Sequence, residues 1–144
     1  MLLVAVLVFG GGFLLLRTVV GGSGGATCDK QQVPLGVSDL SEKGFQTEDG
    51  SLAKVLSLLN TGDISGAESA FYQDSHTFTH DADAKIRQQN EQTAKDLCNA
   101  VLTLEDHFTT TQQTSVLVAD LQRVRGLLSR GGQALGYSPL AGGS

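Results

Sequence analysis

Residues 91–109 read EQTAKDLCNAVLTLEDHFT. Apolar residues recur in this stretch at spacings of three and four, which aligns them along one face of an α-helix. These apolar positions are Ala94, Leu97, Val101, Leu104 and Phe108. Asn90 stands directly before the stretch and belongs to the residue types that cap a helix N-terminus. The stretch therefore predicts an amphipathic helix of about five turns.

Three further stretches repeat this pattern, with short polar connections between them. They are residues 48–60, with Thr47 as the expected cap; residues 63–89, capped by Asp63 and bent near His80–Ala82; and residues 112–129, ended by Gly131-Gly132. No strand candidate of useful length competes with them. Four amphipathic helices with short connections predict an all-α fold, a small antiparallel (up-down) four-helix bundle.

Composition limits the chain to one domain and argues against one class of partner. The chain has 144 residues and a formal net charge of −5. This length accommodates a single domain. An acidic chain without a cluster of Lys or Arg has no electrostatic attraction to a phosphate backbone, so we expect no nucleic-acid binding.

The N-terminal segment is apolar, and residues 2–16 contain no charged side chain. Residues 2–20 have about the length that crosses a hydrocarbon core of ~30 Å. The same run also fits a signal peptide, with a cleavage site near residues 21–26. A third interpretation is a buried core helix, which Gly10-Gly11-Gly12 and the lack of a polar face disfavour. We expect residues 1–20 to be a transmembrane anchor or signal segment, preceding the bundle as a helix.

The rest of the chain divides by composition. Residues 21–46 combine a glycine-rich linker with an irregular lead-in, residues 47–131 form the bundle, and residues 132–144 form a flexible tail. A lipoprotein signal ending at Cys28 is disfavoured, because Gly25 and Thr27 fit the expected motif poorly.

Cys28 and Cys98 are the two cysteines of the chain. In an exported protein an even number of cysteines predicts a disulfide, and this one would tie the lead-in to the helix at 91–109. The alternative is that Cys98 is a small buried residue and Cys28 is free or lipidated. Their separation excludes a CxxC redox or zinc motif.

Histidines and carboxylates form the candidate metal site. His76 and His80 are four residues apart, so a helix brings both imidazoles to one face. Asp83 continues that face, and His107 on the next helix could supply a third imidazole. Imidazole ligands suit divalent copper or zinc. The helical phase places His76 and His80 away from the apolar stripe of their own helix, so solvated histidines are the competing interpretation.

No enzyme motif supports catalysis. Position 77 is Thr, so the HExxH pattern of metalloproteases is absent, and no nucleophile elbow or phosphate loop occurs. We expect a membrane-tethered binding protein on the extracytoplasmic side of a cell membrane, or a secreted or periplasmic one if the segment is cleaved. An accessory subunit of a membrane complex, with a protein partner and no ligand of its own, is the alternative.

Overall fold

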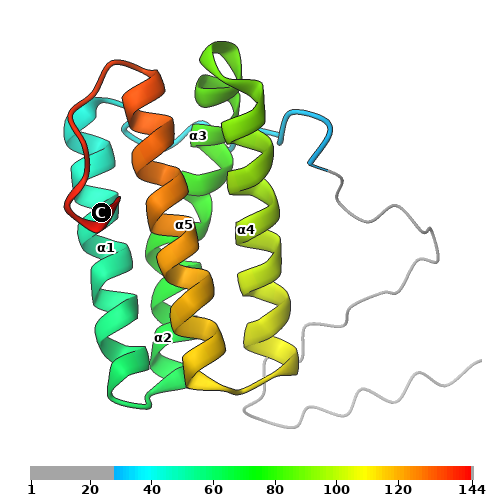
Figure 1. The fold of residues 1–144 in the computed structure, drawn as a ribbon, viewed down its shortest axis with the longest axis vertical. Coiled ribbons are helices and arrows are strands. Elements are labelled where there is room, and N and C mark those ends of the chain that lie inside the picture. Colours follow the sequence, from blue (N-terminus) through cyan, green and yellow to red (C-terminus); the bar gives the residue numbers. More distant parts are fainter. Residues whose placement is uncertain (1–27, 144) are drawn as a thin grey trace, which may run out of the picture.

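The computed structural model describes residues 28–143, and these residues form an all-helical bundle without strands. Figure 1 shows four helical rods side by side, the second of which is composite. The elements are α1 (Glu42–Asn60), α2 (Ile64–Ala70), the π-helical turn η1 (Phe71–Ser75), α3 (His76–Gln89), α4 (Glu91–Thr110), α5 (Thr114–Ala134) and the short 3₁₀ turn η2 (Ala141–Gly143).

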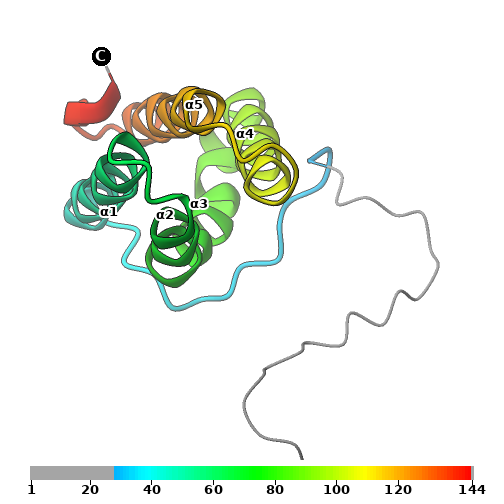
Figure 2. The same ribbon diagram turned by 90° about the horizontal axis from the view of Figure 1, so that it is seen from below.

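The rods run alternately up and down, and each packs on its sequence neighbours. Seen along the bundle in Figure 2, α1, the α2–α3 rod, α4 and α5 follow one another around a common core. The apolar stripes predicted from spacing face this core, and its largest fully buried side chains include Phe45, Phe71, Phe108, Leu52, Leu104 and Leu121. The helical-bundle prediction is therefore confirmed.

Side-chain caps fix two of the predicted helix starts. Asp63 accepts a hydrogen bond from the backbone N–H of Gly66 at the start of α2, and Asn90 accepts one from Thr93 at the start of α4. The start of α1 differs from the expectation, because Ser41 and not Thr47 caps it. Gly62 adopts a left-handed φ of 81°, which suits the position just after a helix end.

The second rod contains a wide turn that the sequence pattern did not reveal. Over η1 the backbone N–H of His76 bonds to the carbonyl of Phe71, five residues earlier. A π-helical turn takes an extra residue relative to an α-helix. The phase calculated for one uninterrupted helix over residues 63–89 therefore does not carry across Ser75, and α3 has its own rotational setting.

A disulfide joins Cys28 to Cys98, which confirms the predicted pairing. The Cα atoms are 5.7 Å apart, and the bridge closes a loop with a sequence separation of 70. Chain-entropy arguments assign such a loop about 4 kcal/mol of stabilisation. The bridge fixes the start of residues 28–41, hereafter the strap, which crosses the outer side of α3 between α4 and α1 (Figure 2).

Asp81 holds the middle of the strap. Its buried carboxylate accepts hydrogen bonds from four consecutive backbone N–H groups, those of Leu35, Gly36, Val37 and Ser38. Burial raises the pKa of Asp81, but these hydrogen bonds outweigh the burial and bring the pKa down to about 2. A strap without regular secondary structure thereby has its backbone donors satisfied.

Asp83 and Lys85 fasten the strap on either side of this point. Asp83 accepts from the backbone N–H of Gln32 at 2.9 Å, and Lys85 donates to the carbonyl of Leu40 at 2.8 Å. The hydroxyl of Tyr137 donates to the same carbonyl. The irregular lead-in is thus bound along the length of α3.

Helix α5 continues through Gly131-Gly132, where the sequence predicted its end. Both glycines lie at close contacts with neighbouring helices. A Cβ atom at Gly131 would lie 2.4 Å from the side chain of Ile86, and one at Gly132 would lie 3.3 Å from Phe45. The absence of side chains lets α5 approach its neighbours closely.

The segment expected to be a flexible tail is packed in the structure. Residues 132–134 complete α5, and the following residues fold back along the bundle (Figure 1). Leu140 is buried, its backbone N–H donates to Ser129, and the N–H of Gly142 donates to Asp49.

The predicted anchor or signal segment, residues 1–20, lies outside the described residues. Within residues 28–143, no helix combines the length and the hydropathy that a membrane crossing requires.

Gly131→Ala should lower the free energy of unfolding by about 1–3 kcal/mol, because the added methyl group overpacks against Ile86. Gly126→Ala on the same helix is the matched control. Its Cβ would meet no atom within 4 Å, so it should stabilise by about 0.5–1 kcal/mol through helix propensity. Urea unfolding followed by circular dichroism measures both, and equal effects would contradict the packing role.

Asp81→Asn should lower the free energy of unfolding at pH 7 by about 2 kcal/mol, because charged acceptors make the stronger hydrogen bonds. The folded-state pKa of Asp81 is about 2 against an ordinary 3.8. Its contribution is therefore present above pH 3.8 and is lost as the pH falls through about 2. Asp81→Asn has no carboxylate to protonate at this position, so its free energy of unfolding should fall less than that of wild type as the pH drops below 3.8.

Urea titrations between pH 2 and pH 7 measure this difference. Asp106→Asn, at an exposed position on α4, is the control for removing one carboxylate. If the free energies of unfolding of wild type and Asp81→Asn differed by the same amount at every pH in this range, the proposed role of the charged Asp81 carboxylate in holding the strap would be contradicted.

Candidate metal centre

His76, His80 and Glu105 meet between α3 and α4. The Nε2 atoms of His76 and His80 are 3.1 Å apart, and Nε2 of His76 is 3.1 Å from Oε1 of Glu105. The three ligand atoms all lie within 4.8 Å of one another. Among the described residues this is the only group of three or more His, Cys, Asp or Glu side chains with that spacing.

Local sequence explains how α3 presents two imidazoles together. A spacing of four residues stacks the rings on one face, with ring centroids 4.5 Å apart. The aromatic rings of Phe71 and Tyr72, in the preceding π-helical turn, flank His76. Their ring centroids lie 6.4 Å and 5.5 Å from that of the His76 imidazole. The turn therefore supplies one wall of the cluster, and α4 supplies the carboxylate.

The cluster is partly buried, and burial decides its protonation. Desolvation lowers the pKa of His76, and it lowers the pKa of His80 together with the neighbouring His76. Desolvation also raises the pKa of Glu105, which His80 partly offsets. Both imidazoles are therefore biased toward the neutral form, which is the form that binds a metal.

One oxygen of the cluster makes no hydrogen bond of good geometry. Oε1 of Glu105 is buried, and it has no hydrogen bond of good geometry even though His76 Nε2 lies nearby. An unsatisfied buried carboxylate oxygen costs about 1–3 kcal/mol or more. A cation between the three ligand atoms would remove that cost.

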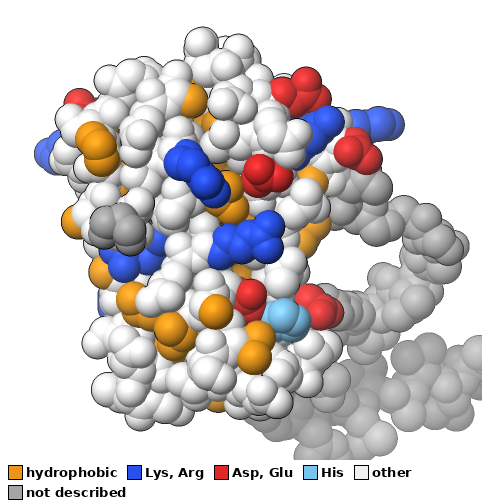
Figure 3. Space-filling view, in the orientation of Figure 1, with side chains coloured by type: hydrophobic (Ala, Val, Ile, Leu, Met, Phe, Trp, Pro, Cys, Tyr) orange, Lys and Arg blue, Asp and Glu red, His pale blue; other side chains and the backbone are white. Residues whose placement is uncertain are grey.

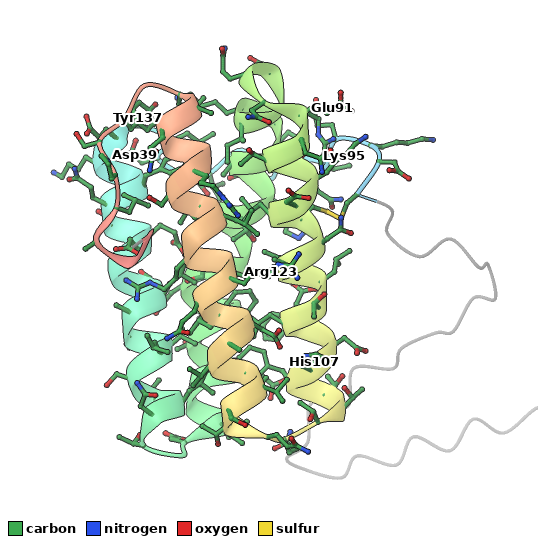
Figure 4. The ribbon with its side chains drawn as sticks, viewed as in Figure 1. Asp39, Glu91, Lys95, His107, Arg123 and Tyr137 are labelled. Carbon is green, nitrogen blue, oxygen red and sulfur yellow. A yellow bond between two sulfur atoms is a disulfide. The ribbon has the colours of Figure 1, made fainter. Side chains whose placement is uncertain are left out.

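Asp83 and His107, which the sequence also predicted as ligands, are bound to other partners. The carboxylate of Asp83 pairs with Arg87 at 2.8 Å and holds the strap through Gln32. The Nδ1 atom of His107 is 2.6 Å from the carboxylate of Asp120 on α5. Figure 4 labels His107 near the lower end of α4, and Figure 3 shows an imidazole on this face beside acidic side chains.

Glu105 is the member of this cluster that sequence reasoning did not select as a candidate ligand. At ~100° per residue, positions 105 and 107 of one helix point about 160° apart. They therefore occupy opposite flanks of the apolar stripe of α4, with Glu105 toward α3 and His107 toward α5. Which of the two residues meets His76 and His80 depends on whether α3 packs against one flank of α4 or the other. The sequence of α4 alone does not determine that packing.

In comparisons with known proteins, no family, no curated protein and no solved structure matches this chain. The functional argument therefore rests on the chemistry of its own residues.

Proposed function

We propose that this chain is a helical-bundle binding protein, not an enzyme, and that His76, His80 and Glu105 bind one divalent transition metal ion. The observation that carries the proposal is the convergence of two imidazole nitrogens and one carboxylate oxygen from two helices. Zinc and divalent copper are the ions that such a donor set suits.

The distances support a single ion. Tetrahedral zinc with bonds of 2.0–2.2 Å has ligand atoms about 3.3–3.6 Å apart. Two of the separations in the cluster are 3.1 Å, and the third is below 4.8 Å. Small side-chain rotations would bring all three atoms into one coordination shell. Three protein ligands leave one position open for water or for a group from a partner.

The surroundings of the cluster also favour a metal. Neutral imidazoles need no proton removed before they coordinate an ion. The buried carboxylate adds one negative charge, which offsets part of the charge of a divalent ion. Asp81 and Asp83, which act on His80 electrostatically, favour positive charge in the same place.

The compartment that we propose is extracytoplasmic, with residues 1–20 as a membrane tether. The support is the disulfide between Cys28 and Cys98, since structural disulfides persist in oxidising compartments. The apolar composition of residues 2–16 agrees with export or anchoring.

The full-length chain, kept in non-ionic detergent, should bind one Zn²⁺ per chain in competition with a chromophoric chelator. His76→Ala/His80→Ala should abolish the binding. Glu105→Gln should weaken it at least about tenfold, since even residues that only support a ligand are worth 10–100-fold.

His107→Ala is the matched control, because it removes an imidazole that faces α5 and Asp120. Its affinity for Zn²⁺ should equal that of wild type, with circular dichroism verifying the fold of every variant. Equal affinity in wild type and in His76→Ala/His80→Ala would refute the proposed function.

A further inference from the structure

The strap carries an exposed apolar stretch on the outside of the bundle. Residues 33–37 read Val-Pro-Leu-Gly-Val, hereafter the VPLGV segment, and all five are exposed. Val33, Leu35 and Val37 are 78%, 55% and 78% exposed, and they are three of the four large hydrophobic residues that are exposed within residues 28–143. Single exposed apolar residues are ordinary, but a contiguous stretch of them marks a surface that another apolar surface covers.

The backbone of the VPLGV segment suits an apolar environment. Pro34 has no N–H group, and the N–H groups of Leu35, Gly36 and Val37 donate to the buried carboxylate of Asp81. Backbone donors that meet hydrocarbon must be satisfied within the protein, because hydrocarbon offers no acceptors. The segment can therefore leave water without losing these hydrogen bonds.

The VPLGV segment also lies close, along the chain, to the proposed membrane tether. Residues 21–27 separate the tether, residues 1–20, from Cys28. A chain of this length spans at most about 25 Å when fully extended. Because the disulfide fixes Cys28 to α4, a tether held in a bilayer keeps the strap within reach of the lipid surface.

We propose that the VPLGV segment docks on the surface of the lipid bilayer that holds residues 1–20, with Val33, Leu35 and Val37 in contact with lipid. The inference rests on the tether of the proposed function. The tether makes docking an intramolecular step, so a few side chains are enough to favour it. The strap runs along the side of the bundle opposite α5 (Figure 2), and docking therefore turns α5 away from the membrane.

Area and charge favour lipid over a second protein chain. A stable protein interface takes about 800 Å² from each partner, which five residues alone do not supply. The VPLGV segment has no charged side chain, and the whole chain has a formal net charge of −5. Attraction to the membrane therefore comes from apolar contact, and we expect it to need neither anionic lipid nor low salt.

A single tryptophan can report this contact, because the chain contains none. Leu35→Trp places the probe in the VPLGV segment, and Ala119→Trp, at an exposed position on α5, is the matched control. Each full-length variant is incorporated into phosphatidylcholine vesicles with or without brominated acyl chains. We expect the fluorescence of Leu35→Trp to shift to shorter wavelength and to be quenched by the brominated chains. The fluorescence of Ala119→Trp should change in neither respect.

Tryptophan itself favours a membrane interface, so the native side chains are tested in the same background. Adding Val33→Asn and Val37→Asn to Leu35→Trp should lower the equilibrium constant for docking at least about tenfold and weaken the quenching accordingly. Both valines are exposed, so these variants are expected to fold, which circular dichroism verifies. Unchanged quenching would overturn the proposal.

Flotation of the vesicles separates this inference from the tether. If the chain floats with the vesicles but Leu35→Trp is quenched no more than Ala119→Trp, docking is refuted and the tether stands. A wavelength shift without quenching also refutes docking on lipid, because protein then covers the strap. A chain that does not float refutes the tether and the docking together, whereas zinc binding at His76, His80 and Glu105 is measured independently of both.

Discussion

The π-helical turn at Phe71–Ser75 sets the rotation of α3 about its axis, and the candidate metal centre depends on that rotation. Below the turn, α2 begins at its Asp63 cap and packs on α1. Above it, α3 turns His76 and His80 toward Glu105 of α4. On the other side, the same turn brings Ser75 near Glu48. Wide turns inside α-helices often accompany functional sites, and this one lies directly before His76 of the candidate metal centre.

The strap keeps α3 in this setting. Its disulfide fastens one end to α4, while the backbone N–H groups bound by Asp81 fasten the middle to α3. Tyr137 and Lys85 hold the far end near α1 through the carbonyl of Leu40. A rotation of α3 that moved His76 away from Glu105 would also break the four hydrogen bonds to Asp81. The irregular segment thus contributes to the order of the candidate metal centre.

Sequence reasoning recovered what depends on local chemistry. Apolar spacing predicted the four rods, Asp63 and Asn90 were recognised as caps, and the even cysteine count predicted the pairing of Cys28 with Cys98. It missed features that depend on contacts between helices. Gly131 and Gly132 resemble a helix end, but α5 continues through them, and Ile86 and Phe45 occupy the space that side chains at these positions would need.

The candidate metal centre shows the same division. The interval between His76 and His80 predicted two imidazoles on one face, and the structure brings them together. Which α4 side chain lies beside the two imidazoles depends on which flank of α4 meets α3. The sequence pointed to His107, whereas the structure places Glu105 there and His107 beside Asp120. The phase argument also assumed an uninterrupted helix, which the π-helical turn prevents.

Diffraction from crystals soaked in Zn²⁺, recorded at the zinc absorption edge, tests the central claim most directly. The account predicts an anomalous peak between α3 and α4, about 2.0–2.2 Å from Nε2 of His76, Nε2 of His80 and a carboxylate oxygen of Glu105. A peak at His107 and Asp120 instead, or no peak between α3 and α4, would contradict it.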